Sequence, residues 1–122
     1  MSNEIMNYLN ICKKIQELDS KIRFAGVINE RGRLVAGGMR EGISSLEQQR
    51  DSEMIFMELA LRVKMRREFD KQLGKVNFAM AHRKFVIDMS FPINEDILYV
   101  ATEADANYSG LIPKIFKILK EN

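Results

Sequence analysis

The sequence has few of the residues on which chemistry at a protein site usually depends. Its 122 residues include one cysteine, one histidine and no tryptophan. A single cysteine excludes a disulfide within the chain, and one histidine leaves little for a metal site or an acid–base pair. Neither phosphate-binding glycine motif occurs. We therefore expect a protein that is not an enzyme and that has no catalytic residues, no metal and no cofactor.

Charge of one sign and long hydrophobic runs are lacking as well. The 19 Lys+Arg residues and 17 Asp+Glu residues give a net charge of +2, which is too small to predict a nucleic-acid partner. No apolar run approaches the roughly 18 residues that span a bilayer. The first ten residues contain neither Lys nor Arg, unlike a secretory signal. These absences predict a cytoplasmic protein with no nucleic-acid partner and no membrane insertion.

What is present is the composition of a globular domain. Hydrophobic residues make up 46% of the chain, with 7 glycines and 2 prolines, and there is no repeat or linker. We expect a single domain over residues 1–122.

The first half of the chain predicts a helix, a hairpin and a long helix. Apolar residues at spacings of three and four predict a helix over 3–18. Strands are expected over 21–28 and 33–39, joined by a type I turn from Asn29 to Gly32. A long helix is expected over about 45–73. Its start is expected between Ser44 and Asp51, with Ser44, Ser45 and Glu47 as a capping box, and Gly74 is expected to end it.

The second half predicts three strands and a final helix. The strands are expected over 76–82, 84–91 and 97–102, with 92–96 as a loop. The helix is expected over about 112–120, with Pro113 in its first turn. The order is α-β-β-α-β-β-β-α, and five short strands joined mostly by hairpins predict an antiparallel sheet with helices on its faces. The strands 21–28 and 84–91 have apolar residues at both odd and even positions, which indicates that both faces of the sheet are covered.

Two segments carry a resemblance to a known family. The hairpin from Gly26 to Val35 and the segment Ala104-Asp105-Ala106-Asn107-Tyr108-Ser109-Gly110-Leu111-Ile112-Pro113 resemble the roadblock family, a branch of the profilin-like superfamily. The resemblance implies a five-stranded antiparallel sheet with the long helix on one face and two shorter helices on the other. It also implies a homodimeric scaffold that acts as a regulator or adaptor of a small GTPase or of a motility or trafficking complex. The implied partner is a small GTPase or another roadblock-like protein.

The long helix has two apolar rows, and two rows need two covering surfaces. One row contains Ile55, Phe56, Leu59 and Val63, and the opposite row contains Met54, Met57, Leu61 and Met65. One row is expected to pack on the sheet. The methionine row either forms a dimer interface or belongs to the core of the same chain, and we favour the dimer interface.

Basic residues follow on the same helix. Arg62, Arg66 and Arg67 form either a partner-docking patch or an ordinary solvated face, because acidic residues are interleaved with them. The alternative function is a small-molecule-sensing module with a pocket between sheet and long helix, lined by Phe24, Phe78, Phe85 and methionines.

The remaining candidates for chemistry are isolated. His82 is expected to be structural or at the surface, and Cys12 to be a buried, inert thiol. Asp88 and Asp105 have no paired carboxylate nearby in the sequence.

Overall fold

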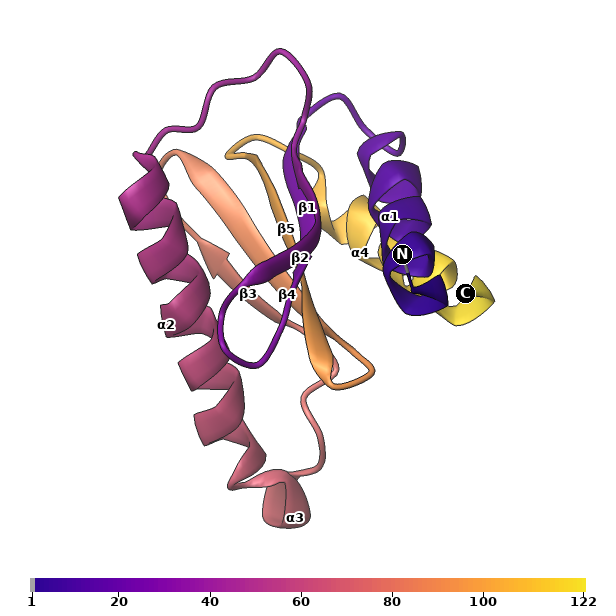
Figure 1. Ribbon diagram of the computed structural model, residues 1–122, viewed down its shortest axis with the longest axis vertical. Coiled ribbons are helices and arrows are strands. Elements are labelled where there is room, and N and C mark those ends of the chain that lie inside the picture. The colour runs from indigo at the N-terminus through magenta and orange to yellow at the C-terminus, as the bar shows by residue number, and fades with distance from the viewer. Residues whose placement is uncertain (1) are drawn as a thin grey trace.

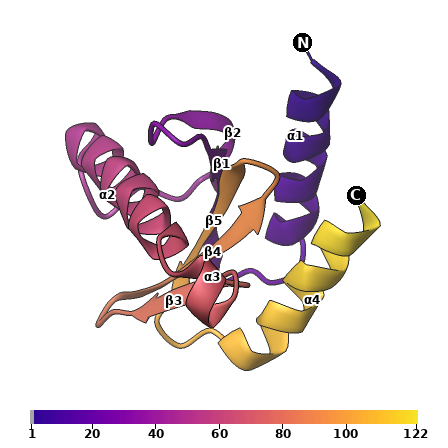
Figure 2. The same ribbon diagram turned by 90° about the horizontal axis from the view of Figure 1, so that it is seen from below.

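The β-sheet lies between α2 on one face and α1 with α4 on the other (Figure 1 and Figure 2). The computed structural model describes residues 2–122. Its elements are α1 (Asn3–Gln16), β1 (Ile22–Ile28), β2 (Leu34–Met39), α2 (Gln49–Arg67), α3 (Asp70–Leu73), β3 (Ala79–His82), β4 (Val86–Ile93), β5 (Asp96–Glu103) and α4 (Tyr108–Glu121).

The five strands form one antiparallel sheet in the order β2-β1-β5-β4-β3. The predicted fold class is therefore confirmed, including the long helix alone on its face. The one-turn helix α3 is the element that the sequence did not predict.

The two faces of the sheet have cores of different size. The larger core fills the space between the sheet and α1 with α4, and includes Tyr8, Ile15, Phe91 and Ile115. The smaller core lies under α2 and consists of Phe24, Ile28, Phe56, Ala60, Ile97 and Tyr99. Its three rings pack at centroid distances of 5.5, 5.6 and 5.9 Å. Long helix α2 thus rests on a narrow apolar contact.

The predicted turn between β1 and β2 is confirmed. The Gly32 N–H donates to the Asn29 carbonyl at 2.9 Å, and Gly32 has φ 77°. The Asn29 side chain accepts from the N–H groups of Arg31 and Arg33 at 2.9 and 3.1 Å. The short amide side chain of Asn29 therefore holds the tight turn, as the sequence indicates.

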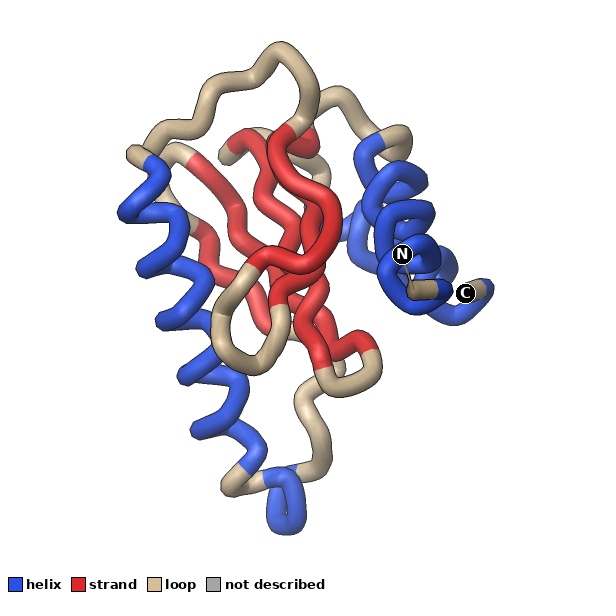
Figure 3. The backbone as a smooth tube through the Cα atoms, viewed as in Figure 1, coloured by secondary structure: helices blue, strands red, loops and turns tan. Residues whose placement is uncertain are grey.

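The long helix starts within the predicted range, but the predicted capping box is wrong. Helix α2 begins at Gln49, and its N-cap Gln48 makes no side-chain capping bond. The Ser45 hydroxyl donates instead to the Glu47 carboxylate, and the Glu47 N–H donates to Ser45 Oγ at 3.3 Å. Both side chains are thus used within the loop that leads from β2 to α2 (Figure 3).

The far end of the long helix is interrupted before Gly74. Helix α2 ends at Arg67, and Phe69 has φ −108° and ψ 7°, outside helical geometry. Gly74 does end the helical segment, but it caps α3, with φ 85°. One predicted helix is therefore two, with a change of direction at Phe69.

Helix α4 begins earlier than predicted, so the placement of Pro113 in its first turn is wrong. The Asn107 side chain caps the helix by accepting from the Gly110 N–H at 3.3 Å. Pro113 then lies inside the helix. It is exposed, so water can solvate the carbonyl that Pro113 leaves without a donor.

The last two hairpins also differ from prediction in their ends. Strand β3 begins at Ala79, and β4 runs through Pro92 to Ile93. Pairing with β3 stops at Ser90, so beyond it β4 is an edge strand, where proline is tolerated.

Candidate functional site

The outward face of α2 carries a row of large apolar side chains. Met54, Met57, Leu61 and Met65 are each 57–60% exposed. The row runs over twelve residues, from Met54 to Met65, and is therefore roughly 16 Å long. These four predicted interface residues do not belong to the core of the protomer.

The exposed row continues past the end of α2. Phe69 is 58% exposed and Leu73 is 82% exposed. Neither residue belongs to the predicted interface, although their spacing of four from Met65 would continue the row on an unbroken helix.

The opposite row of α2 packs on the sheet, as predicted. Phe56 and Ala60 are buried, and Ile55, Leu59 and Val63 pack against them as partly buried residues. The two apolar faces of α2 therefore differ: one holds the helix on the sheet and the other faces outward.

The turn of the first hairpin fixes the middle of α2. A Cβ atom built on Gly32 would lie 2.6 Å from the Met57 Cα atom. Backbone approaches backbone here, which only glycine at positive φ permits. The turn therefore holds the helix at the centre of its exposed row.

The three predicted docking arginines lie in different surroundings. Arg62 pairs with Glu58 at 3.3 Å, and both side chains are about 60% exposed. Arg66 and Arg67 instead line a cavity of about 340 Å³ between the end of α2 and the β4–β5 hairpin. Only two of the three are therefore brought together at one site.

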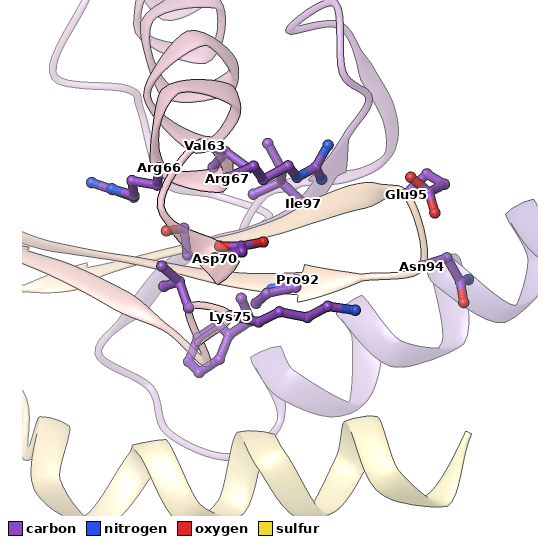
Figure 4. A pocket seen from close by; sticks show the side chains of 12 residues that line it. Val63, Arg66, Arg67, Asp70, Lys75, Pro92, Asn94, Glu95 and Ile97 are labelled. Carbon is purple, nitrogen blue, oxygen red and sulfur yellow. The ribbon is translucent and has the colours of Figure 1, made fainter. Parts of the chain in front are cut away.

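This cavity, which we name the hairpin cavity, also contains residues that the sequence did not indicate. Its lining residues are Val63, Arg66, Arg67, Asp70, Lys75, Val76, Ser90, Phe91, Pro92, Asn94, Glu95 and Ile97. Figure 4 shows Arg67 and Lys75 extending in the same direction, toward Asn94 and Glu95, whereas Arg66 extends the opposite way. Lys75 and Glu95 lie in loops, where no periodic pattern predicts which side chains meet.

A second, larger hollow of about 850 Å³ lies between the N-terminal half of α2 and the sheet. Phe24, Phe56 and Tyr99 line it from inside, and Arg31 and Leu46 line it among the loop residues. A pocket between sheet and long helix was predicted for the sensing alternative. Of its predicted rings, Phe24 is in place.

The other two predicted rings, Phe78 and Phe85, do not line this hollow. Phe78 packs on the opposite face of the sheet, against Phe91 and Phe116 at centroid distances of 5.9 Å. Phe85 is 68% exposed, with the Lys84 ammonium 5.5 Å from its ring.

A polar network lies in the wall of the larger hollow. The Asp88 carboxylate accepts from the Tyr99 hydroxyl at 2.6 Å and from Arg83 Nε at 3.1 Å. Burial, and then the neighbouring Asp88, raises the pKa of the Tyr99 hydroxyl. Asp88 is therefore the acceptor of a structural network and not half of a carboxylate pair.

The remaining sequence candidates are placed as isolated residues. Cys12 is 2% exposed, and burial raises the pKa of its thiol to about 11. His82 is exposed and lies edge-on to Tyr108, with ring centroids 6.0 Å apart. Asp105 pairs with Lys21 at 2.8 Å.

Two absences hold over the described part of the chain. Residues 2–122 contain no group of three or more His, Cys, Asp or Glu side chains that could hold a metal ion. Within the same range, no helix is both long and apolar enough to cross a membrane.

A family model matches the sequence of the chain, and several solved structures are similar to its fold. The model described as "Family of unknown function (DUF6659)" matches residues 2–122. No curated protein matches the chain in sequence.

Three solved structures give the fold. The Roadblock/LC7 domain from Streptomyces avermitilis has a TM-score of 0.70 and 8% identity, over 93% of this chain and 92% of that one. The gliding protein MglB from Thermus thermophilus has a TM-score of 0.79 and 9% identity, over 98% and 87%. A structure described as MglB with tetrameric arrangement has a TM-score of 0.77 and 11% identity, over 98% and 86%. The chain therefore has the roadblock fold, which confirms the resemblance at that level.

Proposed function

The chain belongs to the DUF6659 family, and from its roadblock fold and its exposed α2 face we propose that it is a non-enzymatic, homodimeric docking module. The observation that carries this proposal is the exposed row of Met54, Met57, Leu61 and Met65 on α2. Contiguous apolar surface of this kind marks contacts, and methionine adapts its shape to a partner.

A second copy of the chain is the partner that fits this row best. In a two-fold dimer the same patch occurs on both subunits, so two such rows bury each other. The row is apolar at every position and roughly 16 Å long, which suits helix-on-helix packing. One solved relative of the fold is described as having a tetrameric arrangement, which supports assembly through copies.

The dimer would then serve as a platform for a further protein in the cytoplasm. The resemblance to roadblock proteins, and a structural relative described as a gliding protein, favour a small GTPase, another roadblock-like protein, or a motility complex as that partner. The cations Arg62, Arg66 and Arg67 would supply charge for docking, because guanidinium groups suit acidic partner surfaces.

Light scattering tests the dimer. The chain should have about twice its mass of 14.1 kDa at micromolar concentration. Met57→Asp should halve that mass without unfolding the chain, because a carboxylate buried in an apolar interface costs several kcal/mol.

The matched control is Met6→Asp on α1. Met6 is 53% exposed, close to the 60% of Met57, but it lies on the other side of the sheet. It should leave the mass unchanged. A wild-type chain that is monomeric at tens of micromolar, or a Met6→Asp variant that also dissociates, contradicts the proposal.

A second candidate function is a small-molecule-sensing module. It is favoured by the two hollows of about 340 and 850 Å³ on the α2 side of the sheet, since ligand sites in proteins are typically about 300–1,000 Å³. Ligand binding without a protein partner would distinguish this candidate from a platform.

A further inference from the structure

The hairpin cavity has an apolar wall formed by two elements. Pro92 on β4 pairs with Ile97 on β5, and paired residues project to the same face of a sheet, here toward α2. Val63 from α2 and Val76 from the segment after α3 complete the apolar lining. The cavity therefore offers a contact for an apolar group.

Two cations at this apolar wall form no ion pair with the described residues. Arg67 and Lys75 have no carboxylate oxygen within 4.0 Å anywhere in residues 2–122, and their side chains make no hydrogen bond there. Figure 4 shows both side chains reaching toward the β4–β5 turn, Arg67 from the end of α2 and Lys75 from the segment after α3. Two unpaired cations beside an apolar cavity are complementary to an anion that carries an apolar group.

The other charged residues limit which anion fits. Asp70 and Glu95 also line the cavity, so the rim has cations and carboxylates together. A doubly charged phosphate would be repelled by both carboxylates, whereas a single carboxylate bound between Arg67 and Lys75 is repelled less. Ser90, 7% exposed, also lines the cavity and its strand partner Tyr99 places it on the α2 side.

We propose that the hairpin cavity binds a monocarboxylate attached to one apolar group, with the carboxylate between Arg67 and Lys75 and the apolar group against Pro92 and Ile97. The volume of about 340 Å³ lies at the small end of ligand sites, which suits one amino-acid-sized group and not a larger cofactor. The source of this group is either a free small acid or the carboxyl-terminal residue of a polypeptide.

The absence of tryptophan from the chain provides a direct measurement. N-acetyltryptophan is an apolar monocarboxylate, and its fluorescence can be excited without a protein background from indole. Its emission should change saturably with added protein. N-acetyltryptophanamide has the same ring without the charge, and it should bind at least about tenfold more weakly.

Substitutions on the chain test the two cations separately. Arg67→Gln and Lys75→Gln should each weaken binding of N-acetyltryptophan about tenfold, since each removes a charged hydrogen bond. Arg62→Gln is the matched control, because Arg62 lies on the same helix, is paired with Glu58 and does not line the cavity. It should leave binding unchanged, and Asp70→Asn should tighten binding by removing a repelling charge.

Three outcomes overturn the proposal: no saturable change up to about 10 mM acid, equal binding of acid and amide, or unchanged binding in both Gln variants. An acetylated tripeptide ending in tryptophan distinguishes the sources, because tighter binding than N-acetyltryptophan identifies a polypeptide terminus and equal or weaker binding a free acid. The Met57→Asp variant tests acid binding separately from dimerisation. It should bind the acid normally, so failure of either proposal leaves the other standing.

Discussion

Gly32 is the residue at which the first hairpin and the long helix meet. Its φ is 77°, and a Cβ atom at this position would lie only 2.6 Å from the Met57 Cα, so both the backbone and the contact oppose any other residue. The neighbouring arginines on the turn are exposed, so we expect substitutions there to be tolerated. The turn sequence therefore carries a tertiary constraint as well as a local one.

Gly32→Ala should lower the free energy of unfolding by about 2–4 kcal/mol, through left-handed strain and overpacking together. Urea denaturation measures this loss. Gly42→Ala is the control, because Gly42 has φ 83° but open space around its Cβ position, so it reports backbone strain alone. Equal losses in the two variants would show that the contact with α2 contributes nothing.

The Cys12 thiol makes stability depend on alkaline pH. Burial raises the pKa of the thiol from 9.0 to about 11 in the folded chain. As the pH rises, the thiol loses its proton in the unfolded chain before it does so in the folded chain. The contribution of Cys12 to the free energy of unfolding is therefore complete below pH 9 and is lost as the pH rises toward 11. The loss should be on the order of 2–3 kcal/mol.

Urea denaturation at pH 8 and at pH 10.5 measures this effect against Cys12→Ala. The variant should be less stable at pH 8, because a buried sulfur is removed, but its stability should fall less with pH. The pKa values of Tyr8 and Tyr99 are also raised, so their contribution to stability falls with pH in both proteins alike. Parallel pH profiles for the two proteins would contradict the assignment to Cys12.

At the scale of elements, the sequence predicts what periodicity and turn chemistry determine. The Asn29–Gly32 turn, helix α1 and the two rows of α2 follow from local patterns, and all are present. The ends of helices do not follow in the same way. Ser45 and Glu47 form hydrogen bonds with each other inside a loop and do not cap α2. Asn107 caps α4, which therefore begins earlier than the position of Pro113 predicts.

The candidate site was predictable only where it lies on a helix. Helical spacing identifies the exposed methionine row, and Arg66 and Arg67 follow it at the end of the same helix. It does not indicate Lys75 or Glu95, because these reach the hairpin cavity through the change of direction at Phe69 and the β4–β5 turn. Contacts between such loop residues depend on tertiary packing, which leaves no periodic pattern in the sequence.

The basic end of α2 can be tested as an element. Replacing Arg66 and Arg67 together by Glu should change the melting temperature little, because surface charges contribute roughly 0–1 kcal/mol each. The variant should lose a GTPase or roadblock-like partner that the wild type retains in affinity purification, since like charges across an interface oppose association. Retention of such a partner by both proteins would assign docking to another surface.

At the scale of the whole molecule, the two faces of the sheet are stabilised differently. The face with α1 and α4 has the larger core, whereas α2 rests on Phe24, Phe56, Tyr99 and a few neighbours. A second copy against α2 would add burial where the protomer has least. Folding and association are then expected to be linked.

This linkage predicts a melting temperature that depends on protein concentration. It should rise as the chain is concentrated from about 1 to 100 µM, because mass action stabilises a folded dimer. Met57→Asp should melt at one temperature throughout this range. Scanning calorimetry measures both, and a wild type with a constant melting temperature would indicate that dimerisation adds no stability.

The positions of the chain ends have a practical consequence. The start of α1 and the end of α4 lie on the far side of the sheet from α2 (Figure 2), and the Lys14 ammonium lies 3.5 Å from Asn122 Oδ1. A chain tethered to a biosensor surface through a carboxyl-terminal tag should therefore present α2 to the solution. Fluorescent proteins fused at either end would likewise leave the methionine row free, so labelled subunits can be mixed and their exchange followed without blocking this surface.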